Sequence, residues 1–282
     1  MKSIIKKLNE VIAPWEEYEL SSRGGAVGRR ILTSLKKFYI WSQREFIIRY
    51  LPVLDEIKDK PLSYRILEVG SGVVGLARCT QRKFVGVDVN VRGPHYENMD
   101  LVKAEAWDLP FEDGAFECVV SVDMLEHIPT DRRQDVVLEL LRVSREKVIL
   151  CFPAGVVAEA WERRARRVYQ RIIDNWPDQK PGKEAFVARS CFLTEHFENR
   201  LPTVPEVLQY IKAGGNPRWE ISTRDNESCY VWYWGVLGHM KHNYWRWLLT
   251  TAFFILFFPL LAQCRWGGTY RTVVVVYKQK GK

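Results

Sequence analysis

The sequence lacks the paired cysteines that hold a disulfide scaffold or a zinc ion. Its six cysteines, from Cys79 to Cys264, are scattered and never form a C-x-x-C pair, so neither kind of framework is expected. The basic N-terminus is followed by no long apolar stretch and no small-residue cleavage site, which argues against a secretory signal peptide. These absences favour a cytoplasmic location.

No RNA-binding motif accompanies the excess of positive charge. The 282 residues carry a formal net charge of +8, but the lysines and arginines are dispersed. A basic chain raises the question of nucleic acid, yet without a motif nucleic acid is not the expected partner. An anionic membrane surface or a phosphate-bearing substrate explains the charge at least as well. A hydrophobic content of 47% is enough for a sizeable core.

A glycine-rich stretch at residues 66–77 organises the chain. An apolar run that contains Glu68 is followed by Gly70, Gly72 and Gly75. This order predicts a buried strand, a tight turn and the N-terminus of a helix. Glycines let the backbone approach a ligand closely, and a helix N-terminus favours a polar or anionic group. The same spacing fits the dinucleotide-binding fingerprint, which alone is too common to identify a ligand.

Acidic residues stand where later strands are expected to end. A strand over residues 83–88 ends in Asp88, and a strand over residues 116–122 leads into Asp123. Asp108 lies before the turn that precedes the strand over residues 116–122. Ligands of parallel sheets bind beyond the carboxyl ends of the strands. We therefore expect the glycine-rich turn and these acids to share one site.

The alternation of strands and helices predicts an α/β fold with helices on both faces of the sheet. We expect a doubly wound, Rossmann-like, mostly parallel sheet whose last strand is antiparallel. The remaining expected elements are a helix over residues 131–144, strands over residues 147–153 and 219–222, and a final strand over residues 271–278.

These motifs together resemble the class I S-adenosylmethionine-dependent methyltransferases, and in particular their type 11 methyltransferase-domain group. The resemblance covers residues 60–155, and the later segments look like a branch found among bacterial surface-glycan enzymes. The chain departs from the pattern at Val74, where many members carry a third glycine. The matching motifs are Glu68-x-Gly70-x-Gly72, Asp88, Asp108-Leu109-Pro110-Phe111 and Leu125-Glu126-His127-Ile128.

The resemblance implies S-adenosylmethionine as the cofactor. Gly70 and Gly72 would border its methionine part, Asp88 would hold the ribose, and Asp108 with Leu109 would frame the adenine. A nicotinamide-dependent oxidoreductase is the alternative, because Asp88 also suits its ribose, but the segment that begins at Asp108 has no role there. The full predicted cofactor set is Glu68, Gly70, Ser71, Gly72, Asp88, Val89, Asp108, Leu109 and Asp123.

One histidine follows the strand expected over residues 116–122 closely enough to take part in chemistry. Methyl transfer depends on alignment of the acceptor atom with the methyl group, and an oxygen acceptor also gains about 10²–10⁴-fold from a base. His127 is the predicted base, and a histidine that only packs within its loop is the alternative. Glu126 and His196 are further candidates. No metal site is predicted.

Helices are expected in residues 1–60, before the first strand. Apolar residues recur at helical spacing there, and a long helix is expected over residues 27–57, broken near Pro52. This region would cover the site as a lid or pack against the edge of the sheet, and basic amphipathic helices also bind membranes. An arginine-rich segment at residues 162–171 is either a solvated helix face or a phosphate-binding surface.

The region before the last strand is much longer than a hairpin requires. Residues 229–240 are rich in aromatics, and residues 247–264 carry no charge. As a helix the second stretch would be about 27 Å long, close to the hydrocarbon core of a bilayer at about 30 Å. A single crossing would separate the last strand from its sheet. A hairpin or an interfacial helix avoids that conflict, and burial in the fold or in a dimer interface is the alternative.

The expected organisation therefore has three parts. Residues 1–60 form a helical region, residues 61–223 with 269–280 form the Rossmann-like domain, and residues 224–268 form a hydrophobic insertion. Residues 229–264 would attach the protein peripherally or monotopically to the inner face of the membrane. Its oligomeric state is open.

Besides the oxidoreductase, the sequence leaves three functions open. The first is a methyltransferase at the membrane face that modifies an oxygen of an amphipathic or lipid-linked acceptor, either a glycan intermediate or a quinone. The second is a soluble methyltransferase for small molecules. The third is a non-catalytic scaffold that binds the cofactor without turning it over.

Overall fold

The computed structural model describes residues 44–93, 96–177, 182–238 and 266–278, together with residues 249, 252–253, 256–257 and 260. The helix expected near the N-terminus and the first part of the helix expected over residues 27–57 lie outside the described residues.

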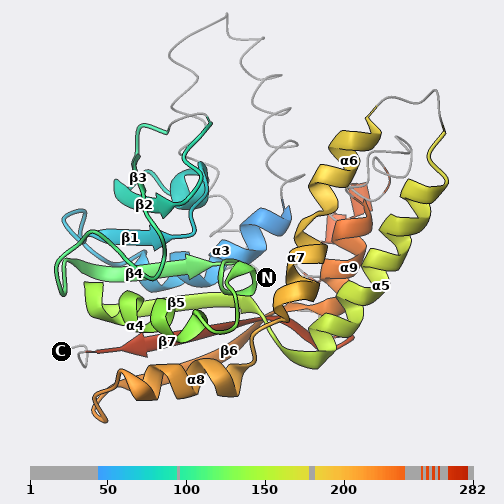
Figure 1. Ribbon diagram of the computed structural model, residues 1–282. Coiled ribbons are helices and arrows are strands. Elements are labelled where there is room, and N and C mark those ends of the chain that lie inside the picture. The colour runs from blue at the N-terminus through green and yellow to red at the C-terminus, as the bar shows by residue number, and fades with distance from the viewer. Residues whose placement is uncertain are drawn as a thin grey trace, which may run out of the picture.

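A seven-stranded sheet forms the centre of the molecule (Figure 1). Its strand order is β3-β2-β1-β4-β5-β7-β6, with β1 to β5 parallel and β7 antiparallel to both of its neighbours. The predicted mostly parallel sheet with an antiparallel last strand is confirmed. The strands are β1 (Ile66–Val69), β2 (Phe84–Asp88), β3 (Met99–Lys103), β4 (Phe116–Val122), β5 (Ser144–Pro153), β6 (Glu220–Ser228) and β7 (Thr269–Tyr277).

Helices cover both faces of this sheet (Figure 1). On one face, α3 (Arg44–Ile57) packs its apolar side against the central strands. On the other face, α4 (Arg133–Val143) and α8 (Val204–Ala213) bury theirs. The central strand β1 is buried along its whole length, as expected for a strand with neighbours on both sides and cover on both faces. The strand order reverses between β1 and β4, where such sheets bind ligands.

A second group of helices lies beyond the carboxyl ends of β4 and β5 (Figure 1). This helical lobe consists of α5 (Gly155–Asp174), α6 (Lys183–Ser190), α7 (Phe192–Asn199) and α9 (Cys229–Gly238). It has its own buried cluster, in which Trp232 of α9 stacks on Tyr270 of β7 with ring centroids 4.1 Å apart. Because Tyr270 belongs to the sheet, this contact ties the lobe to the central sheet.

The predicted break near Pro52 is absent, because α3 continues through this proline. A proline has no N–H to donate to the carbonyl four residues earlier. Here that carbonyl, on Ile48, accepts instead from the side-chain amide of Asn226 on β6 at 3.2 Å. Tertiary contact therefore replaces the hydrogen bond that the proline removes.

Two other elements differ from expectation. The helix expected after the glycines is only a single 3₁₀ turn at Gly75–Arg78, so little helix dipole is available there. Strand β6 extends to Ser228, five residues into the predicted insertion. This strand is the exposed edge of the sheet, and its polar sequence conceals its length from an apolar pattern.

Part of the predicted membrane segment is buried in the fold. In α9, Val231, Trp232 and Leu237 lie in the core of the helical lobe, with Trp232 only 2% exposed. Among the residues that the structure describes, no helix has both the length and the apolar character needed to cross a bilayer.

Candidate active site

The turn after β1 is built from backbone contacts to the neighbouring strand. The N–H groups of Gly70 and Ser71 both donate to the carbonyl of Val87, at 2.8 and 3.1 Å. Gly70 has φ +78°, and a Cβ at this position would collide with the side chain of Met124. A residue with a side chain is therefore excluded twice, by conformation and by space. The result is a tight turn whose backbone faces the cavity.

Glu68 organises this turn from beneath. Its carboxylate accepts from the Tyr50 hydroxyl at 2.7 Å and from the Leu76 N–H at 2.6 Å, and the residue is fully buried. Burial raises the pKa of Glu68 to about 7. Glu68 was predicted to contact the cofactor, but it is not on the cavity wall. The structure assigns it a positioning role instead.

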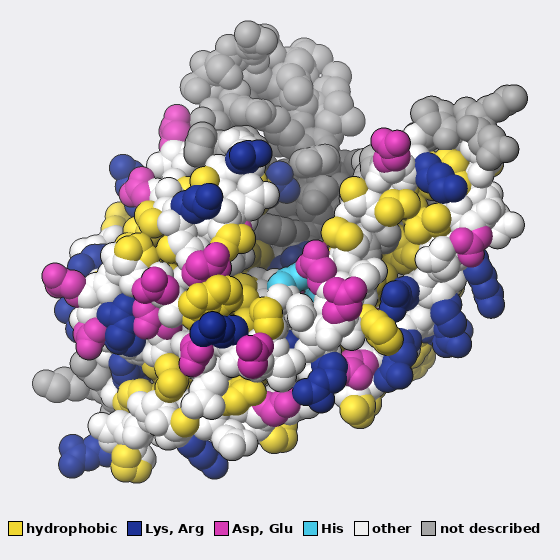
Figure 2. All heavy atoms as spheres, viewed as in Figure 1, with side chains coloured by type: hydrophobic (Ala, Val, Ile, Leu, Met, Phe, Trp, Pro, Cys, Tyr) yellow, Lys and Arg dark blue, Asp and Glu magenta, His cyan; other side chains and the backbone are white. Residues whose placement is uncertain are grey.

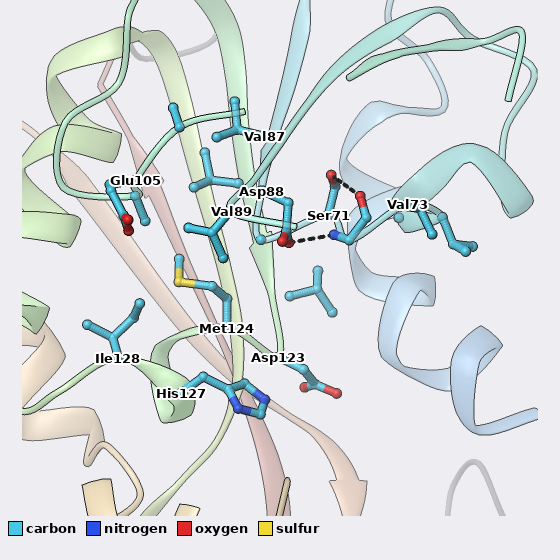
Figure 3. A pocket seen from close by; sticks show the side chains of 18 of the residues that line it. Ser71, Val73, Val87, Asp88, Val89, Glu105, Asp123, Met124, His127 and Ile128 are labelled. Atoms are coloured by element: carbon cyan, nitrogen blue, oxygen red, sulfur yellow. Dashed lines mark hydrogen bonds between the residues drawn. The ribbon is translucent and has the colours of Figure 1, made fainter. Parts of the chain in front are cut away.

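Asp88 lies beside the glycine turn, at the end of β2 (Figure 3). One carboxylate oxygen accepts from the Gly72 N–H at 2.8 Å, and the other accepts from the Asn90 N–H at 2.8 Å. Each oxygen keeps a further lone pair. The side chain is thereby held in one orientation, with acceptor capacity left for ribose hydroxyls.

A cavity of about 570 Å³ lies between the glycine turn with Asp88 on one side and the end of β4 on the other. His127, Asp123 and Met124 lie across it from Asp88 and Ser71 (Figure 3). The sequence missed several of its walls: Arg49 and Tyr50 come from α3, and residues 104–107 come from the loop after β3. The predicted residues that the structure brings together here are Gly70, Ser71, Gly72, Asp88, Val89, Asp123 and His127.

Asp108 and Leu109 do not line this cavity. Leu109 is buried in the core, and its N–H donates to the Glu139 side chain at 2.9 Å. Asp108 is exposed to solvent. The wall predicted for these two residues is formed by the residues just before them, including Ala106 and Trp107. The two predicted side chains are not on the wall, and the adenine position predicted from them stays a prediction.

Asp123 is held by arginines. Arg271 of β7 donates to both carboxylate oxygens, at 2.7 and 2.8 Å, and Arg49 lies 3.1 Å from one of them. Burial alone would raise the pKa of Asp123, but Arg271 and Arg49 together lower it. The residue has φ +50°, a strained value for a non-glycine residue. Its charge is therefore largely compensated by the protein itself.

His127 ends a 3₁₀ turn at Leu125–His127, just after β4. Its Nδ1 lies 2.7 Å from the Glu195 carboxylate on α7. Burial and then His196 lower the pKa of His127, against the opposing effect of Glu195. The ring is thus favoured in its neutral form, with Nδ1–H donated to Glu195 and a lone pair on Nε2. Such a ring can accept a proton or bind a cation.

The comparisons with known proteins match part of this chain to a family model. Residues 67–152 match the model of the methyltransferase domain. A curated relative, the chloroplastic tocopherol O-methyltransferase of Arabidopsis thaliana, is 26% identical over 145 residues, which are 46% of this chain and 39% of that protein. This chain therefore aligns with less than half of the relative's length.

Two solved structures are similar in outline. A geranyl diphosphate methyltransferase in complex with S-adenosylmethionine has a TM-score of 0.48 at 14% identity, over 92% of each chain. The phosphoethanolamine N-methyltransferase 2 of Haemonchus contortus also has a TM-score of 0.48 at 14% identity, over 85% of this chain and 53% of that one.

Proposed function

We propose, from the premise that residues 67–152 are a class I S-adenosylmethionine-dependent methyltransferase domain, that this chain methylates a small or amphipathic acceptor. The cavity of about 570 Å³ carries the proposal, because the glycine turn, Asp88 and His127 all face into it. S-adenosylmethionine is the cofactor of this domain, and its ribose would bind at Asp88. The acceptor would enter from the side of His127.

The proposed reaction is transfer to an oxygen of the acceptor. Alignment of the acceptor oxygen with the methyl group supplies much of the rate. We assign activation of that oxygen to His127, the histidine that lines the cavity. The known reaction of the curated relative is also an O-methylation by its name, although it aligns with this chain over 39% of its length only.

The helical lobe carries a surface suited to a membrane interface. Tyr230, Trp234 and Trp266 are exposed by 37%, 42% and 73%, and both tryptophan rings lie 6.2 Å from the ring of Tyr230. We call these three residues the aromatic patch. Aromatic rings of this kind anchor proteins at the level of lipid head groups. The guanidinium group of Arg164 lies nearby, over Trp161 and Tyr233.

Apolar and basic groups extend this surface. Figure 2 shows basic side chains interspersed with hydrophobic ones along the helical lobe. In the segment before β7, the described apolar residues recur at helical spacing and are exposed by 43–74%: Leu249, Phe253, Leu256, Phe257 and Leu260. A helix with this face would bury it among acyl chains while lying in the interface. We therefore propose attachment to the inner face of the membrane, with a lipid-linked glycan intermediate or a quinone as acceptor.

Turnover is the direct test of the first proposal. The purified chain, S-adenosylmethionine and a lipid extract are expected to yield S-adenosylhomocysteine and a product heavier by one CH₂ group. Mass spectrometry of cells with and without the protein would identify that product. Cofactor binding with no turnover on any lipid or soluble extract would favour the non-catalytic scaffold. Hydride transfer to a nicotinamide would instead favour the oxidoreductase.

Vesicle binding is the test of the membrane proposal. We expect the chain to float with vesicles that contain anionic lipid, and Trp234→Ser with Trp266→Ser to weaken this binding at least tenfold, because each buried aromatic contributes about 1.5–3 kcal/mol. Leu62→Ser is the matched control, since Leu62 is 85% exposed but lies before β1, outside the patch. Full turnover without any vesicle binding would favour the soluble methyltransferase.

A further inference from the structure

Two histidines pack against each other beside the cavity. The Nε2 atoms of His127 and His196 are 3.4 Å apart, although the residues are 69 positions apart in the chain. The Nδ1 of His127 lies 2.7 Å from Glu195, and the Nδ1 of His196 lies 2.9 Å from Glu162. A carboxylate accepts hydrogen bonds, so each Nδ1 carries the hydrogen. With Nδ1 donating, each ring carries a lone pair on Nε2, and these two atoms lie 3.4 Å apart in rings that pack edge to face with centroids 4.7 Å apart.

A cation between the two nitrogens would satisfy both of them. Two nitrogens that both carry a lone pair cannot hydrogen-bond to each other, and the carboxylates hold both rings in place. Glu162 is itself fixed, since Tyr270 donates to the same oxygen at 2.7 Å. Histidines that bind metals characteristically donate their other N–H to a carboxylate, which sets the tautomer and the ring orientation. Both histidines of this pair show that pattern.

A third group completes the set. Glu126 is 1% exposed, and its Oε2 is buried with no hydrogen-bond partner in the described part of the chain. Glu126, His127 and His196 each bring a possible ligand atom to within 4.8 Å of the other two. A buried carboxylate oxygen without a partner is costly, and a cation at this point would compensate it.

We infer that Glu126, His127 and His196 bind a divalent transition-metal ion, with zinc as the best fit. Zinc takes nitrogen ligands at 2.0–2.1 Å in tetrahedral geometry, which separates two nitrogen ligands by about 3.3–3.4 Å. The observed separation is 3.4 Å. Two histidines and one glutamate form a ligand set of catalytic zinc sites, and the fourth position is left for water or substrate.

The position of this site gives the ion a use. His127 lines the cofactor cavity, and His196 lines an adjoining cavity of about 260 Å³ with Arg163, Arg166 and Arg200. An acceptor hydroxyl bound at the fourth position would lose its proton to water more readily. Its oxygen lone pair would then attack the methyl carbon, and the electrons of the broken C–S bond would stay on sulfur. This consequence rests on the proposed function, whereas binding of the ion does not.

The ion also refines the role of His127. In the metal-bound protein its Nε2 lone pair is given to the ion, so His127 activates the acceptor through the metal rather than by taking the proton itself. The sequence predicted no metal site, because His127 and His196 stand far apart in the chain and neither belongs to a spaced metal-binding motif.

Zinc titration of the full chain tests the inference. After treatment with a chelator, the protein is titrated with zinc against an indicator chelator of known affinity. We expect about one zinc ion per chain, and an affinity lowered at least 100-fold in His196→Ala and at least tenfold in Glu126→Gln. Loss of an outer partner in Glu195→Gln should lower the affinity by about 10–100-fold. Glu198→Gln, on the same helix as His196 but outside the cluster, is the matched control and should bind like the unaltered chain.

Thermal unfolding separates loss of the site from loss of the fold. Zinc should raise the melting temperature of the unaltered chain and of Glu198→Gln, because a ligand that binds only the folded state stabilises it. It should not raise that of a folded His196→Ala variant. Equal zinc affinity in the unaltered chain and His196→Ala, or far less than one ion per chain, would overturn the inference and leave a shared proton between the rings. Zinc binding without methyl transfer would refute the proposed function and leave the site intact.

Discussion

The two sides of the cavity are built in different ways. The glycine side, formed by residues 68–75 and Asp88, is held by contacts to backbone N–H groups between residues 8 and 16 positions apart. The histidine side, formed by Glu126, His127 and the α5 and α7 residues around them, is held by side chains 68 and 69 positions apart. The first side depends on local sequence, and the second depends on how the helical lobe packs against the sheet.

The largest effect should come from the histidine side. We expect His127→Ala to slow methyl transfer by about 10²–10⁴-fold, the usual contribution of a group that handles the proton of the acceptor. Cofactor affinity should change little, since Asp88 and the glycine turn are untouched. Single-turnover rates and calorimetry with S-adenosylmethionine measure the two quantities. An unaltered rate would remove His127 from the mechanism. It would mean that the glycine side is sufficient for methyl transfer.

The second-largest effect should come from Arg271, which links the two sides of the cavity. Arg271 pairs with Asp123 and with Glu227, and it is 5% exposed. Arg271→Met should lower the free energy of unfolding by about 3–5 kcal/mol, because it leaves buried carboxylates without their partner. Urea denaturation gives the value.

Arg132→Met is the control for this measurement. Arg132 pairs with Asp135 at 3.4 Å, but both side chains are about half exposed, at 54% and 51%. Such a surface pair contributes about 0–1 kcal/mol. Equal losses in the two variants would mean that the buried network does not hold the sides together.

On the glycine side, Glu68 should make the free energy of unfolding depend on pH. The pKa of Glu68 is about 7 in the fold and 4.5 ordinarily, so between these values the folded state binds more protons than the unfolded state. Stability should therefore fall as pH rises through this window, by about 3 kcal/mol at most, since each unit of pKa corresponds to about 1.4 kcal/mol. Glu68→Gln should lose that part of the dependence. Urea denaturation at pH 5 and pH 8 in both proteins isolates it, and parallel curves would contradict the assignment.

The smallest expected effect is a loss of affinity for the cofactor. Asp88→Ala should weaken binding of S-adenosylmethionine by about 1.5–3 kcal/mol for each lost contact to the ribose, which is roughly tenfold to a hundredfold. Calorimetry measures it, and Asp100→Ala, at an exposed position of β3 outside the cavity wall, serves as the control. Unchanged affinity in Asp88→Ala would show that the ribose does not bind at the end of β2.

The sequence predicts the glycine side well because backbone geometry leaves local signals. The strands β1, β2, β4, β5 and β7 follow from apolar runs, and Gly70 stands where the chain must turn with a positive φ. Where a strand is polar, the prediction weakens. β3 and most of β6 lie at or near the edges of the sheet, where side chains meet water, so β6 was taken to be five residues shorter than it is.

The histidine side could not be predicted in the same way. Nothing near His127 in the chain indicates that Glu195 and His196 lie beside it, because that contact depends on the packing of α7 against the turn after β4. The arginine partners of Asp123 could not be predicted from the sequence for the same reason, because they stand far from it in the chain. Pro52 shows the reverse case, in which a strong local signal is overruled by Asn226 from a distant strand.

Arg271 also sets the order in which a working site can arise during synthesis. The strand that carries it, β7, is made after every other element described, yet it inserts between β5 and β6 and carries the residue that holds Asp123 in place. While residues 269–277 are still inside the ribosome, the nascent chain can form the glycine turn, but Asp123 still lacks its partner Arg271. Competence to react is reached only after β7 has left the ribosome and paired with β5 and β6.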